Sequence, residues 1–212
     1  MRRCVLTASA QIRDYEKIKS HLRTDDFFVC CDGGLYHMEQ LRLQPDYIVG
    51  DFDSYLSDLP ADIPIERLPC VKDDTDTVAA AKLMLEKGFS EFLLIGFTGQ
   101  RLDHTLANIG VLLMLHDHHV KAKMIDDYGE MYIADQTPIL LNKGCCSFFS
   151  LMSVDGPFGG VTISGAKYPL NNAAVTPSYQ YAISNEITEE QCRITIGQGR
   201  ALLLKIQESC NL

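Results

Sequence analysis

Short apolar runs alternate with amphipathic segments along the first part of the chain. The apolar runs are typical of strands buried on both faces of a sheet, and we expect them at 3–8, 27–31, 46–49, 64–68, 92–95 and 120–125. The segments between them predict helices at 12–22, 35–43, 77–87 and 102–115. This order predicts an α/β domain with a mostly parallel sheet flanked by helices.

The pattern changes near residue 128. From there on the apolar runs are short, Gly, Pro, Asn and Asp separate them, and no segment has the periodicity of a helix. We expect strands at 131–133, 139–141, 147–152, 160–164, 179–183, 193–196 and 201–206. The expected domains are therefore an α/β domain at 1–127 and an all-β sandwich at 128–212.

Composition limits the possible partners. The chain has 212 residues, 46% of them hydrophobic, which is enough for a sizeable core. The formal net charge is -9, and no long basic run is present, so nucleic acid and anionic membranes are disfavoured as partners. The apolar start, Cys4–Leu6, is too short for a signal peptide. We expect a soluble, cytoplasmic protein.

Eight cysteines and a histidine cluster raise the question of disulfides or zinc. No C-x-x-C occurs, and the adjacent pairs Cys30–Cys31 and Cys145–Cys146 lie in apolar β-like runs, where neighbouring side chains face opposite sides. His116, His118 and His119 lie at a polar helix end. We interpret the cysteines as small buried hydrophobic residues in a reducing compartment and the histidines as solvated loop residues.

Two carboxylates follow the strand that begins at Asp46. Asp51 and Asp53 are two residues apart, so in an extended backbone they point the same way, while Phe52 turns back toward the core. Two such carboxylates suit Mg²⁺, which usually takes one or two protein carboxylates and the phosphates of a substrate. The alternative is a surface turn, because Gly-Asp-x-Asp-Ser is also good turn chemistry.

A second acidic cluster, Asp73-Asp74-Thr75-Asp76, precedes the helix expected at 77–87. Asp73 or Asp74 could simply cap this helix, because Asp is a preferred capping residue. Asp76 adds a further acid at the edge of the sheet where ligands bind.

A third cluster follows the strand at 92–95: Gly96-x-x-Gly99-Gln100-Arg101-Leu102-Asp103-His104. Its glycines allow a ligand close to the backbone, and the helix start offers free N–H groups to a phosphate. Arg101 is a bidentate phosphate donor, Asp103 could orient Arg101 or bind metal, and His104 could cap, orient Asp103 or touch a nucleotide.

These three clusters together describe Mg²⁺-dependent phosphoryl transfer or phosphate-ester hydrolysis. The chain has no G-x-x-x-x-G-K-[ST], which excludes a P-loop enzyme. The residues by themselves leave both reactions open.

An ordered series of motifs runs along nearly the whole chain. They are Asp32-Gly33-Gly34, the segment 45–54, Asp73-x-Thr75-Asp76, Gly99-x-Arg101-x-Asp103-His104 with Asn108, the segment 165–170, Ser184-Asn185-Glu186 and the segment 197–204. In this order they resemble the thiamine pyrophosphokinase family. The resemblance implies an α/β nucleotide domain, a β-sandwich for thiamine and a homodimer with active sites at its interface. It also implies transfer of the pyrophosphoryl group of ATP to the hydroxyethyl group of thiamine, giving thiamine diphosphate and AMP.

The resemblance also assigns roles by position. Asp51, Asp53 and Asp76 would hold Mg²⁺, and Arg101 and Asp103 would complete the catalytic set. The residues expected around ATP are Asp32, Gly33, Gly34, Lys72, Thr75, Gly99, Gln100 and His104. Ser184 and Asn185 would contact the aminopyrimidine of thiamine. Because the chain has no Trp, we expect Tyr168 to be the stacking surface for the thiazolium. A metal-dependent phosphoesterase and a non-catalytic nucleotide or thiamine sensor on the same fold remain as alternatives.

Overall fold

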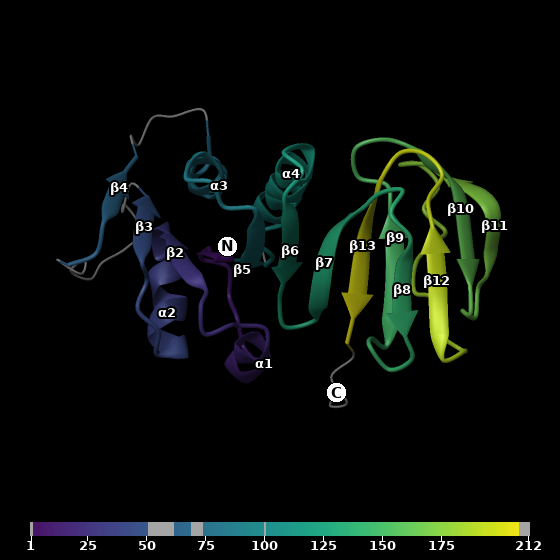
Figure 1. Ribbon diagram of the computed structural model, residues 1–212, viewed down its shortest axis with the longest axis horizontal. Helices are drawn as coiled ribbons and strands as arrows, with labels where there is room; N and C mark the ends of the chain where they lie inside the picture. The colour runs from purple at the N-terminus through teal and green to yellow at the C-terminus, as the bar shows by residue number, and fades with distance from the viewer. Residues whose placement is uncertain (1, 51–61, 69–73, 100, 208–212) are drawn as a thin grey trace. The chain divides into compact units, whose positions relative to one another are not determined.

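The structure, a computed structural model, describes residues 2–50, 62–68, 74–99 and 101–207 in two compact units, Met1–Asp127 and Tyr128–Leu212 (Figure 1). Six residues named above lie outside the described residues: Asp51, Phe52, Asp53, Lys72, Asp73 and Gln100. Each unit is described by itself.

The first unit is built on a parallel sheet. Its strands are β1 (Cys4–Thr7), β2 (Phe27–Cys31), β3 (Tyr47–Gly50), β4 (Ile65–Arg67), β5 (Glu91–Ile95) and β6 (Lys121–Ile125). They lie in the order β4-β3-β2-β1-β5-β6, and every neighbouring pair is parallel. The chain builds outward from β1 to β4 and then returns to the other side of β1. This reversal of strand order between β1 and β5 is where open α/β sheets bind ligands.

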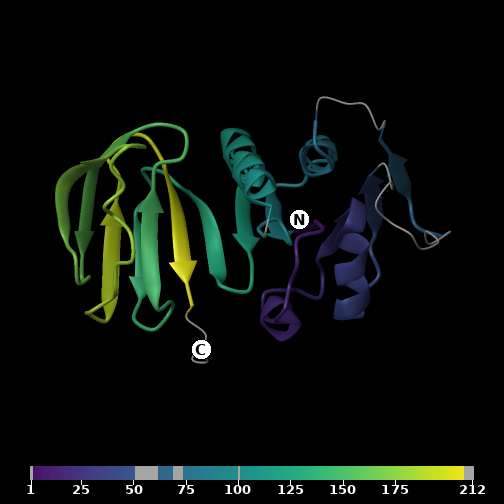
Figure 2. The ribbon, with the colours of Figure 1, turned by 180° about the vertical axis from the view of Figure 1, so that it is seen from behind.

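Helices cover both faces of this sheet, as expected from the sequence. They are α1 (Tyr15–Ser20), α2 (Leu35–Leu41), α3 (Asp76–Glu86) and α4 (Leu102–Asp117), with a short 3₁₀ turn, η1 (Asp32–Gly34), after β2. Residues of α1 and α2 pack in one buried cluster with one side of β1, β2, β3, β5 and β6. The helix α3 contacts β1, β2 and β3, and α4 contacts β6 (Figures 1 and 2). The predicted α/β fold is confirmed.

The second unit consists of two antiparallel sheets. Its strands are β7 (Gly129–Ala134), β8 (Ile139–Asn142), β9 (Phe148–Met152), β10 (Phe158–Ser164), β11 (Leu170–Val175), β12 (Gln191–Thr195) and β13 (Ala201–Ile206). Within this unit β7, β13 and β9 form one sheet, and β11, β10, β12 and β8 form the other. Side chains from both sheets, among them Phe149 and Val161, share one buried core. The predicted all-β sandwich is confirmed.

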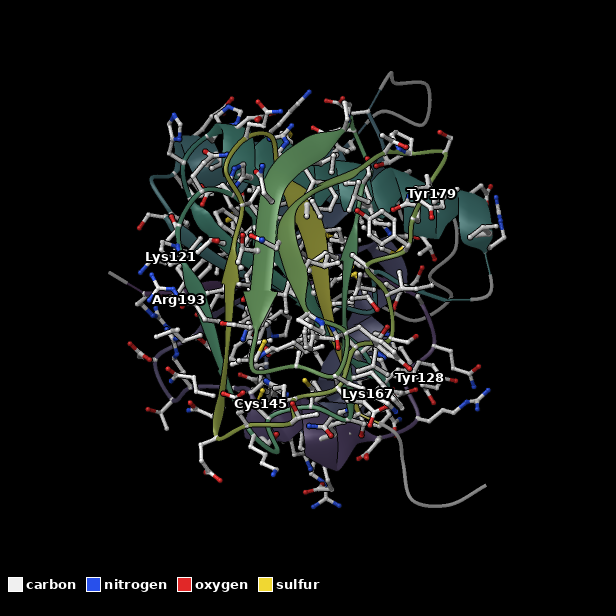
Figure 3. The ribbon with its side chains drawn as sticks, turned by 90° about the vertical axis from the view of Figure 1, so that its right-hand side faces the viewer. Lys121, Tyr128, Cys145, Lys167, Tyr179 and Arg193 are labelled. Atoms are coloured by element: carbon white, nitrogen blue, oxygen red, sulfur yellow. The ribbon has the colours of Figure 1, made fainter. Side chains whose placement is uncertain are left out.

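One predicted strand is wrong. The segment 179–183 does not form a strand, and Tyr179 instead closes a turn with Thr176. The side chain of Tyr179 is exposed (Figure 3), and that of Tyr181 is exposed as well. The strand lies earlier, at β11, the edge of its sheet. The sequence did not predict this strand because it contains Asn171 and Asn172, and Asn has low strand propensity. Asn172 has φ of 50° and lies next to a register shift in the pairing of β11 with β10.

The expectation for one cysteine pair is also wrong. Cys145 and Cys146 do not lie within a strand but in the connection between β8 and β9, and their Sγ atoms are 3.8 Å apart. The pair Cys30–Cys31 does alternate along β2, with Cys30 in the cluster under α1 and α2. The six cysteines in the part of the chain that the structure describes are free thiols.

Candidate functional site

The α/β unit has a cavity of about 640 Å³ at the carboxyl ends of its strands. Its walls come from the residues after β1, the end of β2, the start of α3, the loop after β5 and the start of α4. The lining residues are Ala8, Ser9, Ala10, Gln11, Cys31, Asp32, Thr75, Asp76, Thr77, Gly96, Phe97, Gly99, Arg101, Asp103, His104, Thr105, Ala107 and Asn108. The cavity therefore lies where the strand order reverses.

The segment after β1 is held from two sides. The backbone N–H of Ala8 donates to Ile95 at 2.8 Å, and that of Ala10 donates to Gly96 at 2.9 Å. The carbonyl of Ala10 can only accept, so His37 Nε2 donates to it at 2.9 Å, and Nδ1 of the neutral ring accepts from Tyr15 Oη at 2.8 Å. Burial lowers the pKa of His37, in agreement with this neutral ring.

Asp32 lines the cavity in an unusual backbone conformation. Its φ is 45°, a region that costs a residue with a side chain about 1–3 kcal/mol and often marks a functional site. Gly50, the last residue of β3, lies against it: a Cβ on Gly50 would be 3.2 Å from Asp32 Cα. Gly33 and Gly34 do not line the cavity. Instead they let η1 approach the end of β1, since a Cβ on Gly34 would be 2.1 Å from the carbonyl oxygen of Thr7.

The start of α3 brings a carboxylate to the cavity. Thr75 is the N-cap, because its Oγ1 accepts from Val78 N at 3.4 Å, and Asp76 is the first helical residue. Asp74, considered above as a cap, instead forms an ion pair with Lys82 at 2.7 Å. Asp76 therefore lines the cavity without being the capping residue.

The loop after β5 forms the opposite wall. Gly96 has φ of 71°, and a Cβ there would be 2.4 Å from the Ala8 carbonyl oxygen, so only glycine fits. The N–H of Gly99 donates to Thr105 Oγ1 at 3.1 Å, which ties the loop to the first turns of α4.

Arg101 and Asp103 form a bidentate pair on this wall. Arg101 Nε donates to Asp103 Oδ1 at 3.0 Å, and Nη2 donates to Oδ2 at 2.7 Å. Both side chains are exposed, and the guanidinium holds the pKa of Asp103 well below its usual range. In this geometry Asp103 orients Arg101.

The residues expected around thiamine lie together in the second unit. Asn185 is buried, and its Oδ1 accepts from Tyr168 N at 2.9 Å and from Glu186 N at 3.0 Å, while Nδ2 donates to the Tyr168 carbonyl at 2.8 Å. Ser184 has φ of 54°. The Tyr168 ring is exposed, with Lys167 Nζ 5.6 Å from its centroid. Both lone-pair directions of the Asn185 side-chain oxygen are thus occupied by backbone groups.

The cavity brings together seven of the expected residues: Asp32, Thr75, Asp76, Gly99, Arg101, Asp103 and His104. The sequence reasoning missed the segment 8–11, Cys31, Thr77, Phe97 and Thr105, and it assigned no role to Asn108. The run of small residues directly after β1 is a signal that could have identified the segment 8–11, because small residues leave room for a ligand.

Neither a metal cage nor a membrane span is found in the described part. Within the ranges given above, no three His, Cys, Asp or Glu side chains are grouped to hold a metal ion. His118 and His119 are exposed just after α4, and His118 Nδ1 donates to the Met114 carbonyl at 2.8 Å. The expectation of a solvated loop residue is wrong for His116, which lies within the last turn of α4 and is only partly exposed. Of the helices that the structure describes, none is long and apolar enough to cross a membrane.

Comparison with known proteins gives the same family for both units. A family model described as "Thiamin pyrophosphokinase, catalytic domain" matches residues 18–124, just over half of the chain, and one described as "Thiamin pyrophosphokinase, vitamin B1 binding domain" matches residues 137–201. A thiamine pyrophosphokinase of Bacillus subtilis (strain 168) is 26% identical over 181 residues, covering 82% of this chain and 84% of that protein.

Solved structures show the same fold. The crystal structure of thiamine pyrophosphokinase from Bacillus subtilis has a TM-score of 0.87 at 21% identity and covers 98% of this chain and 100% of its own. Thiamin pyrophosphokinase from Candida albicans has a TM-score of 0.75 at 18% identity, with 97% and 90% covered. The motif order, the two units and the catalytic-domain match agree: this chain belongs to the thiamine pyrophosphokinase family.

Proposed function

We propose that the protein is an ATP- and Mg²⁺-dependent thiamine pyrophosphokinase that transfers the pyrophosphoryl group of ATP to the hydroxyethyl group of thiamine and releases AMP. The observation that carries the proposal is the cavity at the strand reversal. It combines the carboxylates of Asp32 and Asp76 with the guanidinium of Arg101 and the glycine-containing loop after β5. Membership of the family supports the choice of this reaction over other phosphoryl transfers.

The triphosphate of ATP is assigned to the wall formed by the loop after β5. Arg101 lines the cavity, and its two hydrogen bonds to Asp103 fix the orientation of its planar guanidinium. A guanidinium of fixed orientation suits the oxygens of a phosphate. The start of the 16-residue helix α4 directly follows Arg101, and free N–H groups at a helix start also favour an anion. For an in-line displacement at the β-phosphorus, such positioning provides much of the catalysis.

The residues present also fit a magnesium ion. Mg²⁺ binds through one or two carboxylates and the phosphates of a substrate rather than in a cage made only of protein ligands, and the described part of the cavity offers the carboxylates of Asp32 and Asp76. Asp51 and Asp53 follow Gly50, whose backbone lies against Asp32, and we propose them with Asp76 as the metal ligands. When bound, Mg²⁺ would neutralise charge on the triphosphate oxygens.

Thiamine is assigned to the second unit. The exposed ring of Tyr168 offers a flat π surface, which attracts a cation such as the thiazolium of thiamine. Asn185 fixes the backbone of Tyr168 on both sides, through its N–H and its carbonyl. Ser184 is the neighbouring group that we propose for the aminopyrimidine.

We further propose a cytoplasmic homodimer. Leu102 and Leu106, one turn apart on α4, have exposures of 66% and 60%, and Tyr179 and Ile183 are exposed in the second unit. Apolar side chains of this kind are often covered by a partner chain. The free thiols of the described cysteines support a reducing compartment. Analytical ultracentrifugation tests the dimer, and a single monomeric species at micromolar concentration would contradict it.

The test of the reaction uses the full chain with thiamine, ATP and Mg²⁺, and products are separated by chromatography. We expect AMP and thiamine diphosphate in equal amounts, and no AMP when thiamine or Mg²⁺ is omitted. ADP with thiamine monophosphate would show transfer of a single phosphoryl group, and phosphate release without thiamine would show a phosphoesterase. Binding of both substrates without turnover would show a sensor. Each of these three results would overturn the proposal.

A further inference from the structure

Asn108 lies between the two walls of the cavity. It is on the second turn of α4 and is 8% exposed, so its amide must find partners inside the protein. Its Nδ2 donates to the carbonyl oxygen of Phe97 at 2.7 Å, and its Oδ1 accepts from Thr77 Oγ1 at 2.9 Å. One side chain therefore joins the loop after β5 to the start of α3.

The hydrogen bonds form one directed chain. Thr77 has a single hydroxyl hydrogen, which it donates to Asn108, so Thr77 Oγ1 must accept in its 3.0 Å contact with Thr75 Oγ1. The Thr75 oxygen in turn accepts from Val78 N. The chain thus runs from the backbone of α3 through two hydroxyl groups and Asn108 to the backbone of the β5 loop.

The ends of this chain lie beside the groups that we assign to ATP. Asp76 lies between Thr75 and Thr77, and Phe97 leads to Gly99 and Arg101. We propose that Asn108 is a positioning residue. It sets the distance between the carboxylate of Asp76, which we propose as a metal ligand, and the loop after β5, to which we assign the triphosphate. The inference rests on the proposed function, because it assumes that magnesium and the triphosphate occupy this cavity.

The consequence is a specific effect on nucleotide binding. Asn108→Leu keeps a similar volume but leaves the Phe97 carbonyl and the Thr77 hydroxyl without their partner, so the two walls are no longer held together. We expect the KM for MgATP to rise on the order of tenfold, which corresponds to about 1.4 kcal/mol. The KM for thiamine should stay within about twofold, because its site is assigned to other residues.

A matched control separates positioning from folding. Val111→Ala removes a fully buried apolar group three residues further along α4 and leaves the hydrogen-bond chain intact. It should lower the Tm, as we also expect for Asn108→Leu, but leave the KM for MgATP unchanged. If both variants raise this KM equally, or if neither does, the proposed role of Asn108 is wrong.

If Asn108→Leu does not fold, a second pair of variants tests the same hydrogen-bond chain. Thr77 is only partly buried; Thr77→Val removes the hydroxyl at nearly constant shape, whereas Thr77→Ser keeps it. The first variant should raise the KM for MgATP by about fivefold or more, and the second should restore a value near wild type. Equal KM values for the two would overturn the inference.

Equilibrium binding distinguishes this inference from the proposed reaction. Titration calorimetry with Mg²⁺ and α,β-methylene-ATP measures nucleotide affinity without turnover. If the wild-type protein binds this analogue but makes no AMP from ATP and thiamine in the separate turnover assay, the proposed function fails. Weaker binding of the analogue by Thr77→Val than by Thr77→Ser would still support the role of Asn108. If the wild-type protein does not bind the analogue, both proposals fall.

Discussion

Asp76→Asn tests whether the acid at the start of α3 serves the helix or the reaction. The substitution removes one negative charge and changes the shape of the side chain little. In the structure Thr75, not Asp76, caps the helix, and Asp76 lines the cavity. The two roles therefore predict losses of very different size.

The helix role alone predicts a small effect. A carboxylate in the first turn contributes about 0.3–1 kcal/mol through the helix dipole, so the Tm should fall by about 4 °C or less. The metal role predicts a large effect on turnover. If charge stabilisation by the bound metal contributes about 4 kcal/mol, its loss lowers kcat on the order of a thousandfold.

Asp74→Asn is the matched control, because it makes the same chemical change two residues earlier. Asp74 pairs with Lys82 in a partly exposed ion pair, which contributes about 0–1 kcal/mol, and it does not line the cavity. Formation of AMP measures turnover, and thermal unfolding measures stability. Near-normal turnover in folded Asp76→Asn protein, or an equal loss in Asp74→Asn, would refute the reasoning.

Three further predictions follow from buried contacts. Asn185→Ala frees the backbone of Tyr168, so the KM for thiamine should rise about tenfold while that for ATP stays the same; initial-rate kinetics with an unchanged thiamine KM would contradict this. Asp26→Asn leaves the Arg3 guanidinium buried without its bidentate partner, and urea unfolding should show a loss of about 3–5 kcal/mol; a loss below about 1 kcal/mol would be too small for a buried pair. The pKa of His37 is lowered in the fold, so below a pH of about 6.5 the unfolded chain binds a proton that the folded chain does not, and stability falls as the pH decreases. In His37→Gln the change in Tm between about pH 7 and pH 5 should therefore be smaller, and an unchanged slope would assign the pH dependence to other groups.

The elements of the α/β unit could be predicted because local pattern and burial agree there. Residues 27–31 are apolar on both sides of the chain, as is typical of a strand with both faces covered, and β2 has these bounds and contacts both α2 and α3. The same pattern predicted that the acids directly after these strands lie at one edge of the sheet, because the carboxyl ends of parallel strands meet there. In the structure Asp32 and Asp76 do line one cavity.

Other features depend on contacts between distant residues, which a linear pattern does not contain. The strand β11 carries two asparagines at the edge of its sheet, and it is ordered by pairing with β10 rather than by its own propensity. Asn108 lies between Ala107 and Ile109 in α4, and only the structure shows its partners, Thr77 and Phe97. The same holds for Asn185, whose amide binds the backbone N–H and carbonyl of Tyr168. The family resemblance assigned Asn185 to thiamine and gave no sign of these contacts.

The central claim is that the cavity between β1 and β5 holds the triphosphate of ATP with magnesium, and a crystal structure tests it most directly. Crystals of the full chain grown with Mg²⁺ and α,β-methylene-ATP, in which the bond to be broken is blocked, would show where the phosphates lie. We predict the β- and γ-phosphates between Asp76 and Arg101, with a metal ion on the side of Asp76. Phosphates bound at another place on the protein, with this cavity occupied only by water, would contradict the account.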